Sequence, residues 1–353
     1  MEANLALGFL FVVLGALCGG SWALPSKFAD PKTPWEVLWG PFFFLVTLII
    51  PTIAGPIVAR DIVATWQAVS PWAILGPLVF GLLWGSGSMT YGIAFSMVGL
   101  SLAYAINSGT QVVFGWLMPL FVTQGAFKAL GSTGGIIIVI GVAIAVAGVA
   151  ICGYAGVLKS RHLAGQAATA EEKKHGARFV LGLFVTVLSG ILCACAALAF
   201  ATGGPVMAKS AALGNPPWAA GFVVWMLVLW GGALSAFGYC VFKLCMNKTW
   251  SHFKAPGIGK VLLLALAMSL FHDGAIFFYG LAATYLGELG GSVGYAAFMC
   301  GTLVIGNVHG FRTREWQASS PQAVRWILIG IAVLLAAIIT FATGTYIQTM
   351  PAK

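Results

Sequence analysis

Residues 134–153 read GGIIIVIGVAIAVAGVAICG, a run of twenty positions without a charged side chain. The run is apolar on every side, whereas a strand of a membrane β-barrel alternates polar and apolar residues. In a helix, twenty residues span about 30 Å, which matches the hydrocarbon core of a bilayer. The segment therefore predicts a transmembrane helix and an all-α integral membrane protein.

Apolar runs of this kind follow one another along nearly the whole chain. Hydrophobic residues make up 60% of the 353 residues and charged residues 8%, whereas soluble proteins carry about 25% charged residues. Short segments with Pro, Gly and charged residues separate the runs. We expect ten transmembrane helices, at residues 4–26, 35–57, 71–97, 100–124, 134–157, 177–201, 216–242, 260–284, 289–310 and 323–349.

Basic residues concentrate in alternate loops between the predicted helices. One set of loops holds most of the 18 lysines and arginines: Lys27, Lys32, Lys159, Arg161, Lys173, Lys174, Arg178, Lys243, Lys248, Lys254, Lys260, Arg312, Arg314 and Arg325. The other set, which includes both termini, holds Arg60, Lys128, Lys209 and Lys353. Because cytoplasmic loops are enriched in Lys and Arg, we expect the first set to be cytoplasmic and both termini to be periplasmic. The net charge of +9 then reflects membrane topology, and no nucleic-acid partner is expected.

Two patterns from the first half of the chain return in the second half. Residues 91–94 read YGIA, and residues 279–282, at an offset of 188, read YGLA. Residues 99–105 and 290–296 share the pattern Gly-x-Ser-x-x-Tyr-Ala at an offset of 191. A repeat with an odd number of spans inserts its two copies in opposite orientations, as in many secondary transporters that bind substrate between two halves.

The repeat defines the expected domain organisation. We predict a first five-helix repeat at residues 1–158, a cytoplasmic linker at 159–176 and a second, inverted five-helix repeat at 177–353. This symmetry favours a transporter. An enzyme would instead require a cluster of catalytic groups at one membrane face, and the candidate groups are scattered, so we expect no enzymatic activity.

Several segments carry a resemblance to a known family. The segments are Ala23-Leu24-Pro25-Ser26-Lys27, Trp35-Glu36-x-x-Trp39, Gly81-x-x-Trp84-Gly85-x-Gly87-x-x-x-Tyr91-Gly92, Gly99-x-Ser101-Leu102, Phe277-Phe278-Tyr279, Ser292-Val293-Gly294-Tyr295-Ala296-x-Phe298-Met299 and Glu315-Trp316. With these segments the chain resembles the L-rhamnose–proton symporters, within the drug/metabolite transporter superfamily of ten-helix carriers with two inverted halves. The resemblance implies import of L-rhamnose or a related deoxy- or aldohexose, driven by protons, across a bacterial inner membrane. An exporter or facilitator of another small metabolite, such as an amino acid or a drug, is the alternative on the same fold.

Candidate substrate-binding residues lie within the predicted spans. A sugar site needs an aromatic surface for the apolar side of the ring and polar groups for the hydroxyls. The aromatic candidates are Trp22, Trp39, Trp84, Tyr91, Trp225, Tyr279 and Tyr295. Asn107 and Gln111 are four residues apart, share a helix face and can both donate and accept hydrogen bonds. The alternatives are core packing for the aromatic rings, an interhelical hydrogen bond for the two amides, and close helix contact, instead of a ligand, for the glycines around Trp84.

Asp273 is predicted near the middle of a span, with His272 beside it. An ionised carboxylate at that depth costs at least about 2.5–3.5 kcal/mol, so an acid there is a candidate for reversible protonation. Release and recapture of its proton would couple sugar movement to proton movement; a structural carboxyl between helices is the alternative. His272 can also titrate near neutral pH, but adjacent helical residues point about 100° apart, so His272 is equally a candidate for helix packing.

Near the first cytoplasmic turn, Lys27 and Glu36 are candidates for a gate or a salt bridge, with solvated surface charges as the alternative. The chain has no ATP-binding glycine-rich loop, no His-Glu-x-x-His motif and no paired cysteines with metal-ligand spacing. We therefore expect no metal, no cofactor other than protons as the coupling ion, and no ATPase subunit. The expected partners are a sugar and the lipid bilayer.

Overall fold

The computed structural model describes residues 4–120, 131–165, 170–286 and 294–349, and every regular element in these ranges is helical. Two short 3₁₀ segments, Leu24–Phe28 and Thr249–Lys254, and two π-helical segments, Leu45–Ile49 and Ala233–Phe237, interrupt or follow the α-helices. The α-helices are α1 (Leu5–Ser21), α2 (Trp35–Phe44), α3 (Ile50–Val58), α4 (Ile62–Gln67), α5 (Pro71–Val98), α6 (Leu100–Leu120), α8 (Thr133–Gly165), α9 (Ala170–Thr202), α10 (Gly204–Ala212), α11 (Pro217–Gly232), α12 (Gly238–Met246), α13 (Ile258–Leu286), α14 (Tyr295–Arg312) and α15 (Pro321–Thr349).

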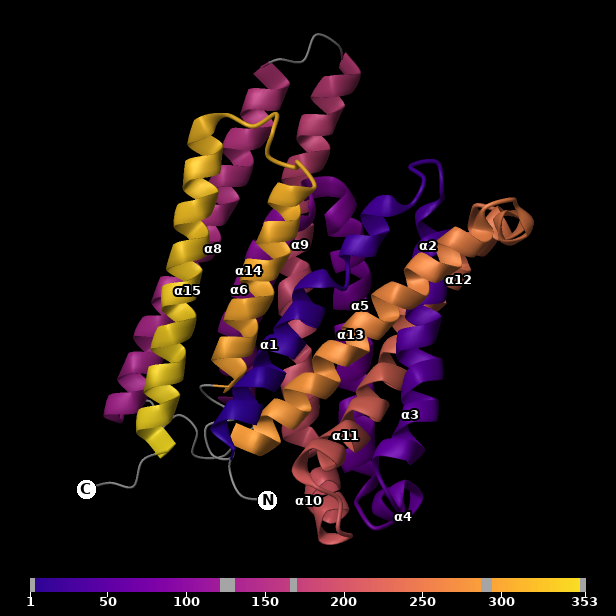
Figure 1. The fold of residues 1–353 in the computed structure, drawn as a ribbon, viewed down its shortest axis with the longest axis vertical. Coiled ribbons are helices and arrows are strands. Elements are labelled where there is room, and N and C mark those ends of the chain that lie inside the picture. Colours follow the sequence, from indigo (N-terminus) through magenta and orange to yellow (C-terminus); the bar gives the residue numbers. More distant parts are fainter. Residues whose placement is uncertain (1–3, 121–130, 166–169, 287–293, 350–353) are drawn as a thin grey trace.

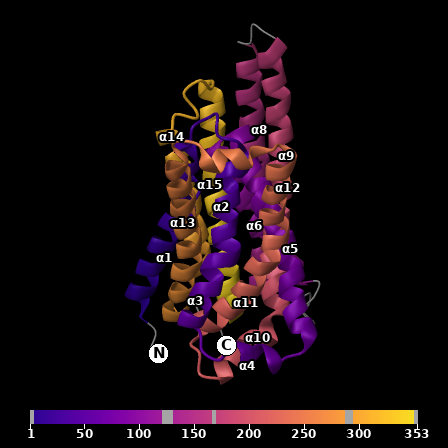
Figure 2. The ribbon, with the colours of Figure 1, turned by 90° about the vertical axis from the view of Figure 1, so that its right-hand side faces the viewer.

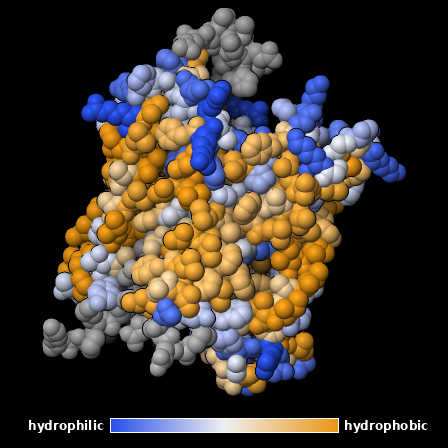
Figure 3. Space-filling view, viewed as in Figure 1, coloured by the Kyte–Doolittle hydropathy of each residue, from blue (hydrophilic) through white to orange (hydrophobic). Residues whose placement is uncertain are grey.

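Within the described residues, eight helical stretches are long and apolar enough to cross a membrane. They are Leu5–Phe28, Trp35–Val58, Pro71–Val98, Thr133–Leu163, Ala177–Thr202, Pro217–Met246, Ile258–Leu286 and Pro321–Gly344. A broad apolar belt covers the face shown in Figure 3, with hydrophilic residues gathered towards its two ends. Large apolar side chains such as Ile57 and Leu234 are 80% and 73% exposed. A soluble protein rarely exposes so large an apolar surface, so the structure agrees with the predicted all-α integral membrane protein.

The long helices run roughly along one common direction and form a bundle with two distinct ends (Figure 1). The α8–α9 hairpin projects at one end in both views (Figure 1, Figure 2), and the turns after α1, α12 and α14 lie at that same end. The short helices α4 and α10 lie at the opposite end, together with the start of α1 and the end of α15. The loops that the charge count groups together are therefore on one side of the bundle; we call it the basic end.

Helix contacts between the two halves of the chain occur in corresponding pairs. Helix α5 packs along α9 and α6 against α9, while α13 packs along α1 and α14 against α1. Helix α11 packs against α5, and α2 packs against α13. Helix α8 packs along α15. The two π-helical segments, Leu45–Ile49 and Ala233–Phe237, are also separated by the offset that relates Tyr91 to Tyr279.

Glycines allow the closest of these helix contacts. A Cβ atom added at Gly81 of α5 would lie 2.3 Å from the carbonyl oxygen of Val228 in α11. One added at Gly231 would lie 2.1 Å from the carbonyl oxygen of Leu78. Small residues let helix backbones approach closely in membranes, so helix α11, and not a ligand, occupies the space beside these glycines.

The described parts of the segment predicted as a linker, residues 159–165 and 170–176, are helical. Helix α8 extends to Gly165, and α9 begins at Ala170. The segment is polar but rich in Ala, Glu and Lys, which have high helix propensity. At these ends α8 and α9 therefore extend beyond the apolar stretches Thr133–Leu163 and Ala177–Thr202.

Candidate functional site

Seven rings from four segments of the chain form what we call the central aromatic cluster. Its members are Trp22, Trp39, Phe42, Trp84, Tyr91, Phe95 and His272. The His272 ring lies 5.5 Å from Trp22, 5.9 Å from Trp84 and 6.0 Å from Phe42, measured between ring centroids. Trp22 and Trp84 are both buried. Four of the predicted aromatic residues are thus in one cluster, together with the predicted histidine.

The cluster lies where the two halves of the chain meet. Trp22 directly follows α1, Trp84 is in the middle of α5, and His272 is in the middle of α13. Trp84 and His272 are separated by the same offset as the repeated Tyr91 and Tyr279. The two residues are thus related by the offset of the predicted repeat, and their rings are in contact.

Asp273 lies beside this cluster on α13. Its Oδ1 atom is 3.1 Å from Nδ1 of His272, and its side chain is 13% exposed. Among the described residues, the Oδ2 atom has no hydrogen-bond partner. Although adjacent helical residues point in different directions, both side chains are long enough for the imidazole to reach the carboxylate. The structure therefore brings the two predicted coupling residues into contact.

Tyr279 and Tyr295 belong to a different group of rings. Their centroids are 5.6 Å apart, and Tyr279 lies 5.0 Å from Phe298. Tyr295 is 39% exposed. This group lies on α13 and α14 next to Gly15 of α1, so these two tyrosines are not part of the central cluster. Trp225, by contrast, extends the cluster, because its ring is 6.1 Å from that of Trp84.

Asn107 and Gln111 share a face of α6, as their spacing predicts, and their side chains are hydrogen-bonded to each other. Gln111 Nε2 donates to Asn107 Oδ1 at 2.5 Å. Asn107 Nδ2 donates to the Ser189 hydroxyl of α9 at 2.7 Å, and Asn107 is fully buried. The amides therefore link two helices; a contact with sugar remains a prediction.

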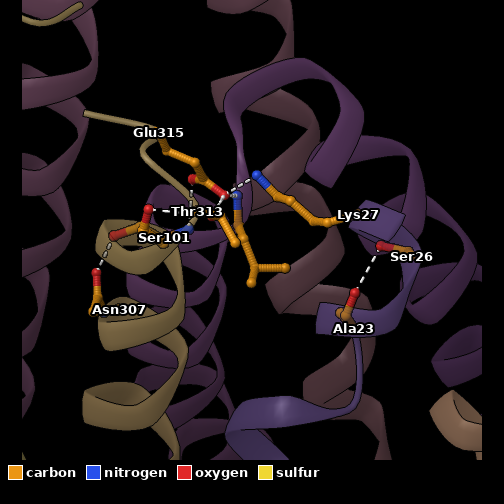
Figure 4. Close-up of polar contacts among 9 residues, drawn as sticks. Ala23, Ser26, Lys27, Ser101, Asn307, Thr313 and Glu315 are labelled. Atoms are coloured by element: carbon orange, nitrogen blue, oxygen red, sulfur yellow. Dashed lines mark hydrogen bonds and ion pairs between the residues drawn. The ribbon is translucent and has the colours of Figure 1, made fainter. Parts of the chain in front are cut away.

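The structure does not bring Lys27 and Glu36 together, contrary to the predicted salt bridge. Glu36 Oε1 is buried and accepts hydrogen bonds from Asn247 Nδ2 at 2.8 Å and Thr249 Oγ1 at 2.9 Å. Lys27 instead forms an ion pair with Glu315 (Figure 4). Sequence distance misled this prediction, because the turn after α14 comes closer to Lys27 than the start of α2 does.

Sequence reasoning assigned no role to Glu315, which is a centre of polar contacts at the basic end. Its carboxylate binds Lys27 and the backbone at the start of α6. One signal was present: Glu315 is the acid nearest to three bases, Arg312 at the end of α14, Arg314 in the turn and Arg325 in α15. An acid among bases at the end of a membrane helix is a candidate for a specific ion pair.

Among the residues that the structure describes, His, Cys, Asp and Glu side chains form no group of three or more that could hold a metal ion. All seven cysteines are free thiols, and Cys152, Cys193, Cys195 and Cys240 are buried.

The whole chain is similar to one family of transporters. The family model for the L-rhamnose-proton symport protein matches residues 1–345. An L-rhamnose-proton symporter of Cronobacter sakazakii is 28% identical over 345 residues, which cover 96% of this chain and 97% of the relative. A Yersinia pestis protein of the same name is 27% identical over 344 residues, with the same coverage. No solved structure gave a significant match. The chain belongs to the L-rhamnose-proton symport protein family.

Proposed function

We propose that this protein imports L-rhamnose, or a related deoxy- or aldohexose, together with protons across the bacterial inner membrane. Family membership over residues 1–345 and the shared name of the full-length relatives support this function. The eight apolar helical stretches supply the membrane domain that such a transporter requires.

The observation that carries the proposal is the contact between the central aromatic cluster and the His272–Asp273 pair. Aromatic rings can stack on the apolar side of a sugar, and a carboxylate oxygen with no protein partner can bind a sugar hydroxyl or a proton. Trp22 and Trp84 supply the rings next to His272, and Oδ2 of Asp273 supplies the free acceptor. In this proposal Trp22 and Trp84 form the sugar-stacking surface, and Asp273 carries the proton.

The proposed architecture has ten transmembrane helices in two inverted halves, as expected for alternating access. Besides the eight stretches, α6 contains 21 residues and α14 contains 18, which is sufficient to cross most of a hydrocarbon core. The corresponding pairs of helix contacts between the two halves support the inverted repeat, as do the two π-helical segments at the repeat offset. Because basic loops face the cytoplasm, the basic end is proposed to be cytoplasmic and both termini periplasmic.

Proton-coupled uptake can be tested with purified protein in sealed vesicles that enclose a pH-sensitive dye. Addition of L-rhamnose should make the outside medium alkaline and acidify the interior, and a proton ionophore should remove the pH difference. D-sorbitol and L-alanine serve as control solutes of similar or smaller size. Rhamnose uptake without proton movement would exclude symport, and uptake of alanine but of no hexose or deoxyhexose would favour a different metabolite.

A further inference from the structure

Three segments that are distant in sequence meet at Glu315, at the basic end of the bundle (Figure 4). We call this contact the Glu315 latch and define it by Lys27, Gly99, Leu100, Ser101 and Glu315. Lys27 lies on the 3₁₀ segment Leu24–Phe28 after α1, and Glu315 lies in the turn between α14 and α15. The other three residues form the junction between α5 and α6. The latch therefore closes the same end of the bundle from both halves of the chain.

Glu315 is bound to the start of α6 by two hydrogen bonds as well as to Lys27. The backbone N–H of Leu100 donates to Oε1 at 2.8 Å, and the backbone N–H of Ser101 donates to Oε2 at 3.0 Å. The first N–H groups of a helix have no partner within the helix, and the positive end of the helix dipole favours an anion there. The Glu315 side chain is only 6% exposed. The two N–H groups at the start of α6 nevertheless stabilise its negative charge without help from Lys27.

Gly99 makes this arrangement possible. Its φ of +86° is in a region that favours glycine. A Cβ atom at this position would also lie 2.5 Å from Oε2 of Glu315. The glycine therefore serves both the sharp turn between α5 and α6 and the space that the carboxylate occupies.

The α14 side of the latch is attached to α6 by further contacts. The Ser101 hydroxyl donates to Oδ1 of Asn307 in α14, and a Cβ atom at Gly310 would lie 2.1 Å from the Cβ of Ser101. Trp316, next to Glu315, is buried and lies under Lys159 of α8, whose Nζ is 4.8 Å from the ring centroid. Breaking this side apart would disrupt several contacts at once.

Lys27 is the detachable part of the latch. Its side chain is 26% exposed, and its Nζ pairs with Glu315 from the 3₁₀ segment. When one partner of a buried ion pair leaves, the remaining charge is normally left without compensation. Here the carboxylate would keep both backbone donors, and the ammonium group would enter water. The geometry thus allows the Lys27–Glu315 pair to break without leaving a buried charge that has no stabilising partner.

We propose that Glu315 is a gating residue: the Lys27–Glu315 pair closes the basic end and breaks when that end opens, while Glu315 stays bound to α6. This inference rests on the proposed function, because it assigns the closed and open forms to the two states of a transport cycle. Glu315 is a positioning residue in this scheme and makes no contact with the central aromatic cluster. Gly99 and Ser101 hold it in place.

The test measures the distance between the two sides of the latch. Spin labels are attached to cysteines introduced at the exposed positions Phe28 and Gln317 in a full-length variant that lacks the native cysteines. Distances are recorded without sugar by pulsed electron paramagnetic resonance. Lys27→Met should raise the ratio of long to short distances about tenfold, which corresponds to about 1.4 kcal/mol. The matched change at the neighbouring exposed lysine, Lys32→Met, should leave the distribution unchanged.

A charge-swapped variant separates this latch from a simple salt bridge. A simple pair would be restored in the double variant Lys27→Glu with Glu315→Lys. In the latch the swap places a cation against the N–H groups of Leu100 and Ser101, so the long distances should persist. Recovery of the wild-type distribution by the swap would overturn the role of α6 in the latch.

An unchanged distribution in Lys27→Met would overturn the gating role itself; this variant keeps the aliphatic stem, and its folding is checked by size-exclusion chromatography. The sugar assignment is tested separately. If Lys27→Met lengthens the distance but wild-type vesicles take up no rhamnose, the latch stands and the substrate is wrong. If uptake is normal and the distances do not change, the latch is wrong.

Discussion

Replacement of Asp273 by Asn tests the proposed coupling most directly. The amide has nearly the shape of a protonated carboxyl group but cannot release a proton. The site is a confined one, with the Asp273 side chain 13% exposed and in contact with His272. Because both the protonated acid and the amide are neutral, we expect the variant to fold and insert normally. It should bind sugar but should not link sugar movement to proton movement.

The size of the effect follows from the energy of the proton gradient. One charge that crosses a potential of 100 mV supplies about 2.3 kcal/mol, and each 1.4 kcal/mol corresponds to a factor of ten. A carrier that moves one proton with each sugar can therefore accumulate sugar about 50-fold. Without a group that releases the proton, Asp273→Asn should reach a ratio of about one.

The assay is uptake of labelled rhamnose into vesicles with an imposed potential of 100 mV, negative inside. A second measurement, exchange of internal unlabelled for external labelled sugar without a gradient, checks that the carrier still cycles. Asp30→Asn is the matched control, because Asp30 is exposed and its carboxylate accepts only the backbone N–H of Lys32 among the interactions described. Normal 50-fold accumulation by Asp273→Asn would refute the assignment of Asp273 as the coupling residue.

Two further predictions concern packing. Gly81→Ala should lower the thermal unfolding temperature in detergent, because its Cβ would lie 2.3 Å from the backbone oxygen of Val228 and overpacking costs about 1–3 kcal/mol. The control Gly221→Ala on α11, where no atom lies within 4 Å of the added Cβ, should leave that temperature unchanged. Equal unfolding temperatures for the two variants would contradict the close contact of α5 and α11. Asn107→Ala should lower the free energy of unfolding by about 0.6–1.7 kcal/mol, the range for interhelical hydrogen bonds in membranes. In a double-mutant cycle with Ser189→Ala, the two losses of stability should not be additive. Full additivity would exclude the hydrogen bond between Asn107 and Ser189.

Features that extend along one helix could be predicted from the sequence. The run 134–153 indicated a membrane helix by its length and uniform apolarity alone, and α8 contains it. The spacing of Asn107 and Gln111 predicted that the two would share a face, and their side chains are hydrogen-bonded. The repeat offset that relates Tyr91 to Tyr279 also relates Trp84 to His272 in the central aromatic cluster.

Contacts between segments far apart in the chain were harder to predict from the sequence. The spacing of Lys27 and Glu36 suggested a salt bridge, but Lys27 pairs with Glu315, in the second half of the chain. Tyr279 and Tyr295 satisfied the same criteria as Trp22 and Trp84 but belong to another group of rings. The glycines around Trp84 allowed either a ligand or a helix to approach, and only the positions of α11 and α9 decided between them.

The sequence by itself determined the class of protein, the segregation of basic loops and the offset that relates Tyr91 to Tyr279. These properties follow from hydrophobicity and charge, which act on each segment of about twenty residues separately as it partitions between water and lipid. Only the tertiary structure decided which rings surround His272 and which base binds Glu315. Those contacts depend on how the helices pack against one another. Because lipid is as apolar as the helix surfaces, hydrophobicity does not determine that packing. It is determined by shape, by small residues and by hydrogen bonds between segments far apart in the chain.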